Sequence, residues 1–519
     1  MALTDQSGRT AWRHPPPLSA TPLGALIAVH IAVALVMRVF AMLRFRLDSD
    51  ELQHLHVARG WTQGLVQYRD VYDNHLPLFH LVNAPWLPLA GERADIWLYA
   101  RLTMVPFAVT ALWLTYVIAA RLYDRRTAVW CTLAASLMPI TLLRGIEFRN
   151  DHFTVVFSLA ALALCLHKLT PRRAFAIGLL LGASFAGSIK TIVILACLGV
   201  ALTLTAYVRH ERELFRDLAM IGAGLLVVPS LVAGFFAYHG ALDDLVQLAI
   251  VNNGRVAVAA WRRVGGIGIA SFTLVCVSAW AIRRGRNVRR EAMIVAIAGL
   301  LFGPFTLAVS PLVTERDFLP IYPIAMMFVA ATILPHLRIL RHAVPALMIL
   351  WVFAHDDGWD TERDYHRQLL RETVAVTRPG ELLLDLKGET VFRPRPTFYA
   401  LEQVSRDLIA RGLIADTAAR DVVSRRCYVA TRDASFFPPV TRAFLNQHFV
   451  SVGSLRVAGQ RITNSTFSIA VPGPYTVIDA AGRPLERGTY AAGTHAAKAG
   501  ANARFVVWSP ALERGFKPL

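Results

Sequence analysis

Across its 519 residues the chain is 55% hydrophobic and only 17% charged, and its formal net charge is +18. Apolar stretches of about 17–22 residues recur through its first two thirds, each long enough to cross roughly 30 Å of hydrocarbon as a helix, which excludes a soluble globular protein. The basic residues are spread over many short loops rather than gathered in one patch, which excludes a nucleic-acid-binding surface.

These stretches predict a multi-pass α-helical membrane domain over residues 22–355, preceded by a cytoplasmic segment at residues 1–21. No signal-peptide cleavage pattern precedes the first stretch, so we expect that stretch to remain as a membrane span. About eleven spans are predicted, near residues 22–43, 100–120, 127–143, 152–167, 174–189, 191–208, 218–237, 267–282, 291–311, 318–334 and 343–354.

The short loops predict the orientation of the spans. When the N-terminus is placed in the cytoplasm, every predicted inner loop is basic, as at Arg125 and Arg126 or at Arg289 and Arg290. This distribution agrees with the positive-inside rule. An odd number of spans then places the C-terminal region outside the cytoplasm, so the net charge is largely a signature of topology.

The chain changes character after residue 355, where hydrophobic runs become short and are broken by Pro and Gly. The runs ELLLDLKG, RRCYVATRD and FVSVGSLRV predict strands, with a helical stretch between the first two, so we expect a small extracytoplasmic α/β domain at residues 356–465. FSIAVPGPYTVID and ARFVVWSP predict a β-rich, sandwich-like domain at residues 466–519. Cys427 is the single cysteine of this region and therefore cannot form a disulfide within it.

The loop between the first two spans, residues 44–99, is rich in acidic residues and histidines. It begins DSDELQHLH, from Asp48 to His56, and in a helix lying on the membrane Asp50 and His54 would be one turn apart on the same side. Charge beside a bilayer is costly, so it usually marks a functional site. The alternative is a capped interfacial helix with Asp50 at its start.

A second polar segment in this loop is YRDVYDNHLPLFH, which places Asp73, Asn74 and His75 just before Pro77. Proline punctuates turns, and an ordinary solvated loop is the alternative for this segment when it is taken alone.

A third polar segment, RGIEFRND, leads into the fourth predicted span. It places Glu147, Arg149 and Asp151 at spacings of two, which in an extended loop aims the three side chains the same way. Asp151 also fits the N-cap of the span that follows, and that role is compatible with a functional one.

Two basic residues lie at other predicted boundaries of the membrane. Lys190 falls between two spans that leave no room for a loop, so its ammonium needs a carboxylate, a phosphate or access to water. Snorkelling is the alternative, but it works less well where both flanking segments enter the bilayer. Arg316, in TERDFLPIYP, stands at another outer boundary.

In this order, the segments DSDELQHLHVARGWTQG, YRDVYDNHLPLFH, EFRNDHFTVVFSLAALAL, GASFAGSIKT and ERDFLPIYP resemble motifs of the membrane-embedded C-type (GT-C fold) glycosyltransferases. The resembling branch holds the protein O-mannosyltransferases and the lipid A aminoarabinose transferase, and the likeness runs from about Arg38 to Pro323. The chain departs from the motifs in two places. His75 and Leu76 stand where the family commonly has Lys and Pro, and Asp317 and Phe318 stand where an aromatic residue commonly follows the arginine.

The resemblance implies a sugar donor linked to a polyprenyl phosphate and an acceptor hydroxyl outside the cytoplasm, on lipid A or lipopolysaccharide, a cell-envelope glycan or a protein. It also implies a place in the plasma membrane, which is the inner membrane in bacteria. An inverting single displacement is expected, because one base and a good leaving group suffice. The resemblance implies catalytic roles for Asp50, Asp151 and Glu51, contacts to the donor phosphate for Lys190, Arg149, His75 and Arg316, and substrate contacts for Asp73, Asn74, His54 and Glu147.

No cofactor is expected to be required; the alternative is a divalent cation held by Asp50, His54 and Asp151. The competing function is that of a polytopic transporter or flippase for a lipid-linked or small polar substrate. Such proteins place polar sites near the bilayer midplane and often show two similar halves. Here the polar residues gather at the outer ends of spans, and the first-loop pattern has no second copy. A non-catalytic assembly protein would leave the acidic loop unexplained.

Overall fold

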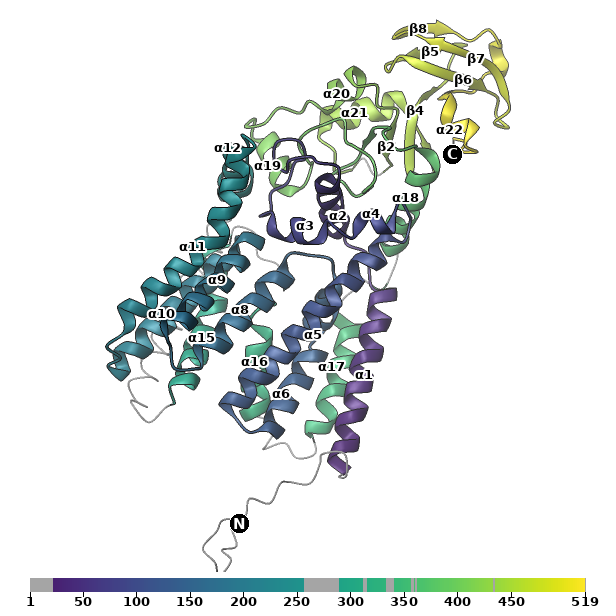
Figure 1. Cartoon of the computed structure of the whole chain (residues 1–519). Helices are drawn as coiled ribbons and strands as arrows, with labels where there is room; N and C mark the ends of the chain where they lie inside the picture. The colour runs from purple at the N-terminus through teal and green to yellow at the C-terminus, as the bar shows by residue number, and fades with distance from the viewer. Residues whose placement is uncertain are drawn as a thin grey trace, which may run out of the picture.

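The computed structural model describes residues 22–255, 289–310, 315–332, 340–355, 359, 362–432 and 435–518. A bundle of long helices forms one end of the molecule and a region of sheet and short helices forms the other (Figure 1). The short helices α2 (Ser49–Thr62), α3 (Leu78–Asn83) and α4 (Leu87–Ala90) of the first loop lie between the two parts. The first loop is therefore in a position to contact both of them.

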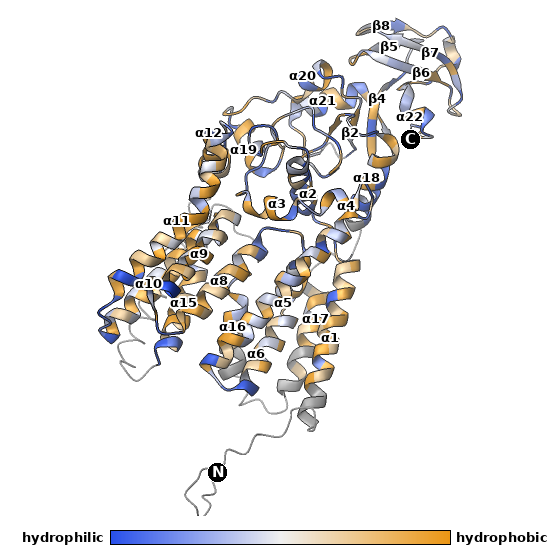
Figure 2. Cartoon of the chain, in the orientation of Figure 1, coloured by the Kyte–Doolittle hydropathy of each residue, from blue (hydrophilic) through white to orange (hydrophobic). Residues whose placement is uncertain are grey.

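The helical part is built from apolar segments, and hydrophobic residues dominate its helices in Figure 2. Within the described residues, five helices are long and apolar enough to cross a membrane: α1 (Pro22–Arg44, apolar from Ile27), α5 (Ile96–Leu122), α10 (Thr191–Arg209), α11 (Leu214–Tyr238) and α15 (Arg290–Val309). The number becomes six when a bent pair, α6 (Arg125–Leu137) and α7 (Pro139–Leu143) with the turn after it, is counted as one broken span. The chain is thus a multi-pass helical protein, but the predicted count of eleven spans is not confirmed.

The differences from the prediction have local causes. The 69° bend after α6 occurs at Pro139, whose ring cannot continue the preceding helix. Other predicted spans correspond to shorter helices, namely α8 (Asp151–Cys165), α9 (Pro171–Gly187), α16 (Tyr322–Thr332) and α17 (Leu340–His355). The predicted span at residues 267–282 lies outside the described residues.

Helices α9 and α11 pack at very close range because glycines face the partner backbone. A Cβ atom at Gly224 would lie 2.1 Å from the backbone oxygen of Phe175, and one at Gly178 would lie 2.0 Å from that of Ile221. Small residues of this kind let two membrane helices approach until their backbones touch.

We expect Gly224→Ala to separate α9 from α11 and to lower the free energy of unfolding by about 1–3 kcal/mol, since a methyl group would overlap the backbone of α9. Thermal unfolding of the purified protein in detergent measures the effect. Gly222→Ala is the matched control, because a Cβ at Gly222 of the same helix meets nothing within 4 Å. Equal melting temperatures for the two variants would contradict the tight interface.

Helix α2 of the first loop is capped two residues before Asp50, the residue that the alternative interpretation of the sequence placed at the start of the helix. Its N-cap is Asp48, whose side chain accepts a hydrogen bond from the Asp50 backbone N–H, while the Glu51 carboxylate accepts one from the Asp48 backbone N–H. This capping arrangement satisfies the amide groups at the start of the helix. Asp50 is therefore not the cap, and its carboxylate is available for other contacts.

The C-terminal region forms one continuous sheet across the expected boundary at residue 465. Strands β4 (Leu455–Arg461), β9 (Phe505–Trp508) and β6 (Gly473–Ile478) are antiparallel neighbours, so the two predicted domains share a sheet. The sheet order is β1-β2-β4-β9-β6-β7, with β3 on β4, where β1 is Leu383–Leu384, β2 Val429–Thr431, β3 Phe449–Val452 and β7 Pro484–Tyr490. Strands β5 (Thr466–Ile469) and β8 (Gly493–Ala496) form a second, two-stranded sheet.

A single buried cluster extends through this region, from Leu369 to Ala511. Strands β4 and β9 thus pair across the expected boundary, and the residues on its two sides share one core. Helix α18 (Glu362–Val376) precedes the sheet, and helices α19 (Gln403–Ala410), α20 (Ala418–Ser424), α21 (Pro439–His448) and α22 (Ser509–Glu513) complete the region.

Candidate active site

Asp50 of α2 lies between two cations that come from different parts of the chain. Its Oδ2 atom pairs with the Arg149 guanidinium, and its Oδ1 atom pairs with the ammonium group of Lys387 in the C-terminal region. Burial alone would raise the pKa of Asp50, but the charges of Lys387 and Arg149 outweigh it and hold that pKa well below its usual range. Asp50 is therefore ionised across the physiological range.

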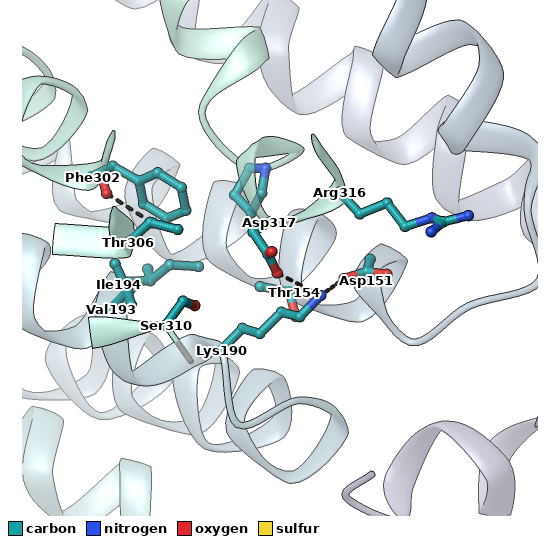
Figure 3. Close-up of a pocket in the computed structure, with 11 residues that line it drawn as sticks. Asp151, Thr154, Lys190, Val193, Ile194, Phe302, Thr306, Ser310, Arg316 and Asp317 are labelled. Carbon is teal, nitrogen blue, oxygen red and sulfur yellow. Dashed lines mark hydrogen bonds and ion pairs between the residues drawn. The ribbon is translucent and has the colours of Figure 1, made fainter. Parts of the chain in front are cut away.

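Asp151 and Lys190 form the centre of a second ion-pair group, shown in Figure 3. The Lys190 ammonium lies 2.8 Å from a carboxylate oxygen of Asp151 and 2.8 Å from one of Asp317. Arg149 donates to the other oxygen of Asp151 at 3.2 Å and so connects this group to Asp50. Asp151 is the first residue of α8 and Asn150 is its N-cap, so the expectation that Asp151 is the cap was wrong.

Arg316 joins the same network from its far side. It donates two hydrogen bonds to Glu147, at 2.7 and 3.0 Å, and pairs with Asp48 as well. Glu147 also accepts a hydrogen bond from Arg144 at 3.1 Å and is fully buried, so both of its oxygens are engaged inside the protein. Glu147 thus holds Arg316 in place, and its predicted substrate contact stays a prediction.

Exposure separates the members of the network that a substrate can reach from those that only support it. Asp50 retains 28% side-chain exposure against 5% for Asp151 and 0% for Glu147. Among the cations, Lys190 retains 34% against 9% for Arg149 and 12% for Arg316. Asp50 and Lys190 are thus the acid and the cation open to ligands.

Glu51 is buried and tied to Arg101 of α5. Arg101 donates to both carboxylate oxygens, at 2.9 and 2.6 Å, and the backbone N–H of Phe148 donates to one of them at 2.9 Å. With the capping bond from the Asp48 backbone, no oxygen of Glu51 is left for a substrate. Glu51 thus has all its partners inside the protein, and the catalytic role suggested for it by the sequence stays a prediction.

His54, Asp73 and His80 are buried, and the partly exposed His75 joins them in one group. Asp73 lies 2.8 Å from Nδ1 of His75 and 3.4 Å from Nδ1 of His80, while Nε2 of His80 lies 2.8 Å from Nδ1 of His54. Burial lowers the pKa of His80 to about 4 and that of His54 well below its usual range, so both rings are neutral near pH 7.

His75, predicted to face the donor phosphate, therefore has a buried carboxylate as its partner. Asn74 is held through its backbone oxygen by Asn253 at 2.8 Å. The predicted substrate contacts of His54, Asp73 and Asn74 are not tested by these distances and stay predictions.

The three residues considered for a divalent cation do not form a coordination site in this structure. Within the described ranges, no group of three or more His, Cys, Asp or Glu side chains is arranged to hold a metal ion. Asp50 and Asp151 are bound to cationic side chains instead, and His54 is packed against His75 and His80.

Two cavities lie next to the ion-pair network and share Ile194, Phe302 and Pro320 as lining residues. The first has a polar side made by Asp151, Lys190, Arg316 and Asp317 (Figure 3). The second is enclosed almost wholly by apolar side chains from α8, α10, α15 and α16 with the segment before it, such as Leu159, Leu198 and Ile324. Charged side chains thus border the first cavity, and mainly apolar side chains line the second.

Sequence analysis missed Lys387 and the role of Asp317. Asp317 carried a signal, since it is adjacent to Arg316 and departs from the motif that the segment resembles. Lys387 carried none, because a lysine at the end of a predicted strand is ordinary and its partner Asp50 is 337 positions away.

Comparison with known proteins identifies the fold of the chain. No protein-family model matches the chain, and no curated protein matches it in sequence. ArnT from Cupriavidus metallidurans, solved bound to undecaprenyl phosphate, is similar with a TM-score of 0.58 over 83% of this chain and 97% of its own, at 14% identity. Its apo structure gives the same TM-score, over 84% of this chain and 98% of its own, at 13% identity.

The Archaeoglobus fulgidus oligosaccharyltransferase is a more distant match, with a TM-score of 0.43 over 89% of this chain and 72% of its own, at 10% identity. The similarity to ArnT extends over nearly the whole of that protein and shows that this chain has the GT-C fold. The resemblance stated from the sequence motifs is thereby confirmed at the level of the fold.

Proposed function

We propose that this chain, which has the GT-C fold, transfers a sugar from a polyprenyl-phosphate-linked donor to an acceptor hydroxyl on the outer face of the plasma membrane. The observation that carries the proposal is the position of Asp50: an ionised, partly exposed carboxylate whose partner Arg149 also binds Asp151, which lines a cavity together with Lys190. ArnT, whose fold is similar, has been solved with undecaprenyl phosphate bound.

The cavities support a lipid-linked donor. The hydrocarbon chain of the donor would lie along α8, α10, α15 and α16, whose apolar side chains line the second cavity, and its phosphate would lie at the polar side of the first, beside Lys190. Lys190 is the most exposed of the network's cations, and its two carboxylate partners would share it with the phosphate. Arg316, which borders the same cavity, would add positive charge.

The transfer itself would be a single displacement. The acceptor oxygen forms a bond to the anomeric carbon, the bond from that carbon to the phosphate oxygen breaks, and the hydroxyl proton passes to the carboxylate of Asp50. Polyprenyl phosphate leaves as an anion and needs no general acid, because cations stabilise its charge. Attack from the side opposite the leaving group inverts the anomeric centre.

We also propose that the reaction needs no metal ion. Lys190, Arg149 and Arg316 supply positive charge next to Asp50 and Asp151, which is the electrostatic contribution a divalent cation would otherwise make. Activity that is unchanged by a strong chelator is the expected result. Activity lost with the chelator and restored by added Mg²⁺ or Mn²⁺ would contradict this part of the proposal.

The test of the function is glycosyl transfer by the purified protein in detergent, with a panel of radiolabelled polyprenyl-phosphate sugars and envelope acceptors. Consumption of one donor with formation of a labelled product is the expected result. If properly folded protein consumes no donor, the function fails, and uptake of a lipid-linked substrate by vesicles would then favour a transporter.

Replacing Lys190 with Ala is expected to raise the KM for the donor by about 10–100-fold and to change the KM for the acceptor far less, because a charged hydrogen bond to phosphate contributes about 1.5–3 kcal/mol. Initial rates with each substrate varied in turn measure the two constants. Lys190→Arg, which keeps the charge beside Asp151 and Asp317, is the matched control. An equal rise in both constants would assign Lys190 a structural role.

A further inference from the structure

The loop that carries Lys387 has a well-defined shape, set by the buried carboxylate of Asp385. Asp385 accepts hydrogen bonds from the backbone N–H groups of Gly388 and Thr390, from the Thr390 hydroxyl and from Arg395, at 2.7–3.0 Å. The chain reverses at Gly388, where φ is +99°. Because four hydrogen bonds close the loop, the backbone from which the Lys387 side chain extends is held in one position.

The same loop is fastened to the first loop of the membrane part. His56 of α2 lies 3.1 Å from the backbone oxygen of Val391, and a Cβ at Gly388 would be 2.7 Å from the His56 ring. Arg393 of the C-terminal region and Arg59 of α2 both pair with Glu92, at 2.8 and 2.7 Å. These contacts hold the C-terminal region against α2, the helix that carries Asp50.

The two cations on Asp50 are not equivalent. Arg149 is shared among Asp50, Asp151 at 3.2 Å and Asp48 at 3.9 Å, so it is fixed from several sides. Lys387, in the part of the chain that the structure describes, has its ion pair with Asp50 alone. Its ammonium ends a flexible four-carbon chain, so it can leave Asp50 without disturbing other ion pairs.

We propose that Lys387 is a positioning residue of the active site, through which the C-terminal region completes the catalytic centre. Its ammonium holds the Oδ1 atom of Asp50 until the acceptor hydroxyl takes its place there. Arg149 meanwhile keeps Oδ2 in position. The inference rests on the proposed function, because it supposes that Asp50 receives the proton of the acceptor.

Loss of the ammonium has two consequences. Asp50 can rotate so that both oxygens face Arg149, which turns its free oxygen away from the acceptor. The low pKa of Asp50 also rises when Lys387 is removed, since burial raises this pKa and one fewer cation then opposes that effect. Activity depends on the ionised form of Asp50. On acidification, the variant would therefore lose activity at a higher pH than the wild type does.

The test compares Lys387→Met, which keeps the length of the side chain and removes its charge, with the wild-type full chain. We expect kcat to fall about 100-fold, the loss typical of a catalytic group misplaced by about 1 Å, while the KM for the donor stays within about threefold. The acid limb of the profile of kcat/KM against pH should move to higher pH. Lys387→Arg should restore the wild-type limb and most of kcat.

The control is Lys498→Met, which makes the same change at an exposed position of the C-terminal region. It should leave kcat, both KM values and the pH profile unchanged. If Lys387→Met does not fold, Lys387→Gln removes the charge with a polar side chain and serves for the same measurements.

The outcomes separate the two proposals. Wild-type protein that transfers no sugar overturns the function and the role of Lys387 together. Active wild-type protein with a neutral Lys387 variant whose kcat and acid limb are unchanged overturns only the role of Lys387. A fall in kcat with an unmoved acid limb that Lys387→Arg does not repair also overturns it, because it indicates a merely structural contact.

Discussion

Replacing Asp50 with Asn is expected to lower the rate of glycosyl transfer about a thousandfold, because a general base contributes about 10²–10⁴-fold. The amide keeps the shape of the side chain but cannot take up the proton of the acceptor hydroxyl. Asp50 is the best placed of the network's carboxylates for this task, since Asp151 and Glu147 are almost completely buried. Transfer from the active donor, measured under single-turnover conditions, reports the loss.

Asp95→Asn is the control for this experiment. Asp95 belongs to the same first loop but is 48% exposed and pairs with the exposed Arg93. Its substitution should leave the rate unchanged. An Asp50→Asn variant that inserts into the membrane, binds donor and transfers sugar at the wild-type rate would remove Asp50 from the mechanism.

Replacing Arg101 with Met is expected to cost about 3–5 kcal/mol of stability, because it leaves the buried carboxylate of Glu51 without its cation. Arg101 is fully buried, binds both oxygens of Glu51 and also donates to the backbone oxygens of Met42 and Phe45 at 3.1 and 3.3 Å. It therefore joins α5 to the end of α1 and the start of α2. A lowered melting temperature and poor recovery of folded protein are the expected observations.

Two further variants test whether the unpaired carboxylate causes the loss of stability. Arg93→Met breaks an exposed ion pair with Asp95 and should change the free energy of unfolding by no more than about 1 kcal/mol. A double variant, Arg101→Met with Glu51→Leu, removes both buried charges and should regain much of the lost stability. If the double variant melts as low as the single one, the damage comes from lost packing and not from the unpaired carboxylate.

The class of the protein and most of its helices could be predicted from the amino-acid sequence. Hydropathy is a local property, so the long apolar helices α1, α5, α10, α11 and α15 could be located from the sequence alone. The acidic first loop, the RGIEFRND segment and Lys190 were recognised in the same way, because charge at the end of an apolar stretch is conspicuous wherever the chain folds.

Which charged side chains pair with one another could be learned only from the tertiary structure. Glu51 and Asp50 are neighbours in the sequence, yet one is bound by Arg101 inside the protein and the other faces Arg149 and Lys387 at a partly open site. No periodicity distinguishes the two carboxylates, because their roles depend on side chains that packing brings from elsewhere.

The pairing of the strands could likewise be learned only from the tertiary structure. β4 joins β9 across the boundary expected at residue 465, since strands pair through backbone groups that carry no sequence signature of their partner. Local chemistry thus predicted the elements and the candidate residues, whereas the active site depends on contacts between segments as far apart as Asp50 and Lys387. Such contacts form only when the membrane helices and the C-terminal sheet pack against the first loop.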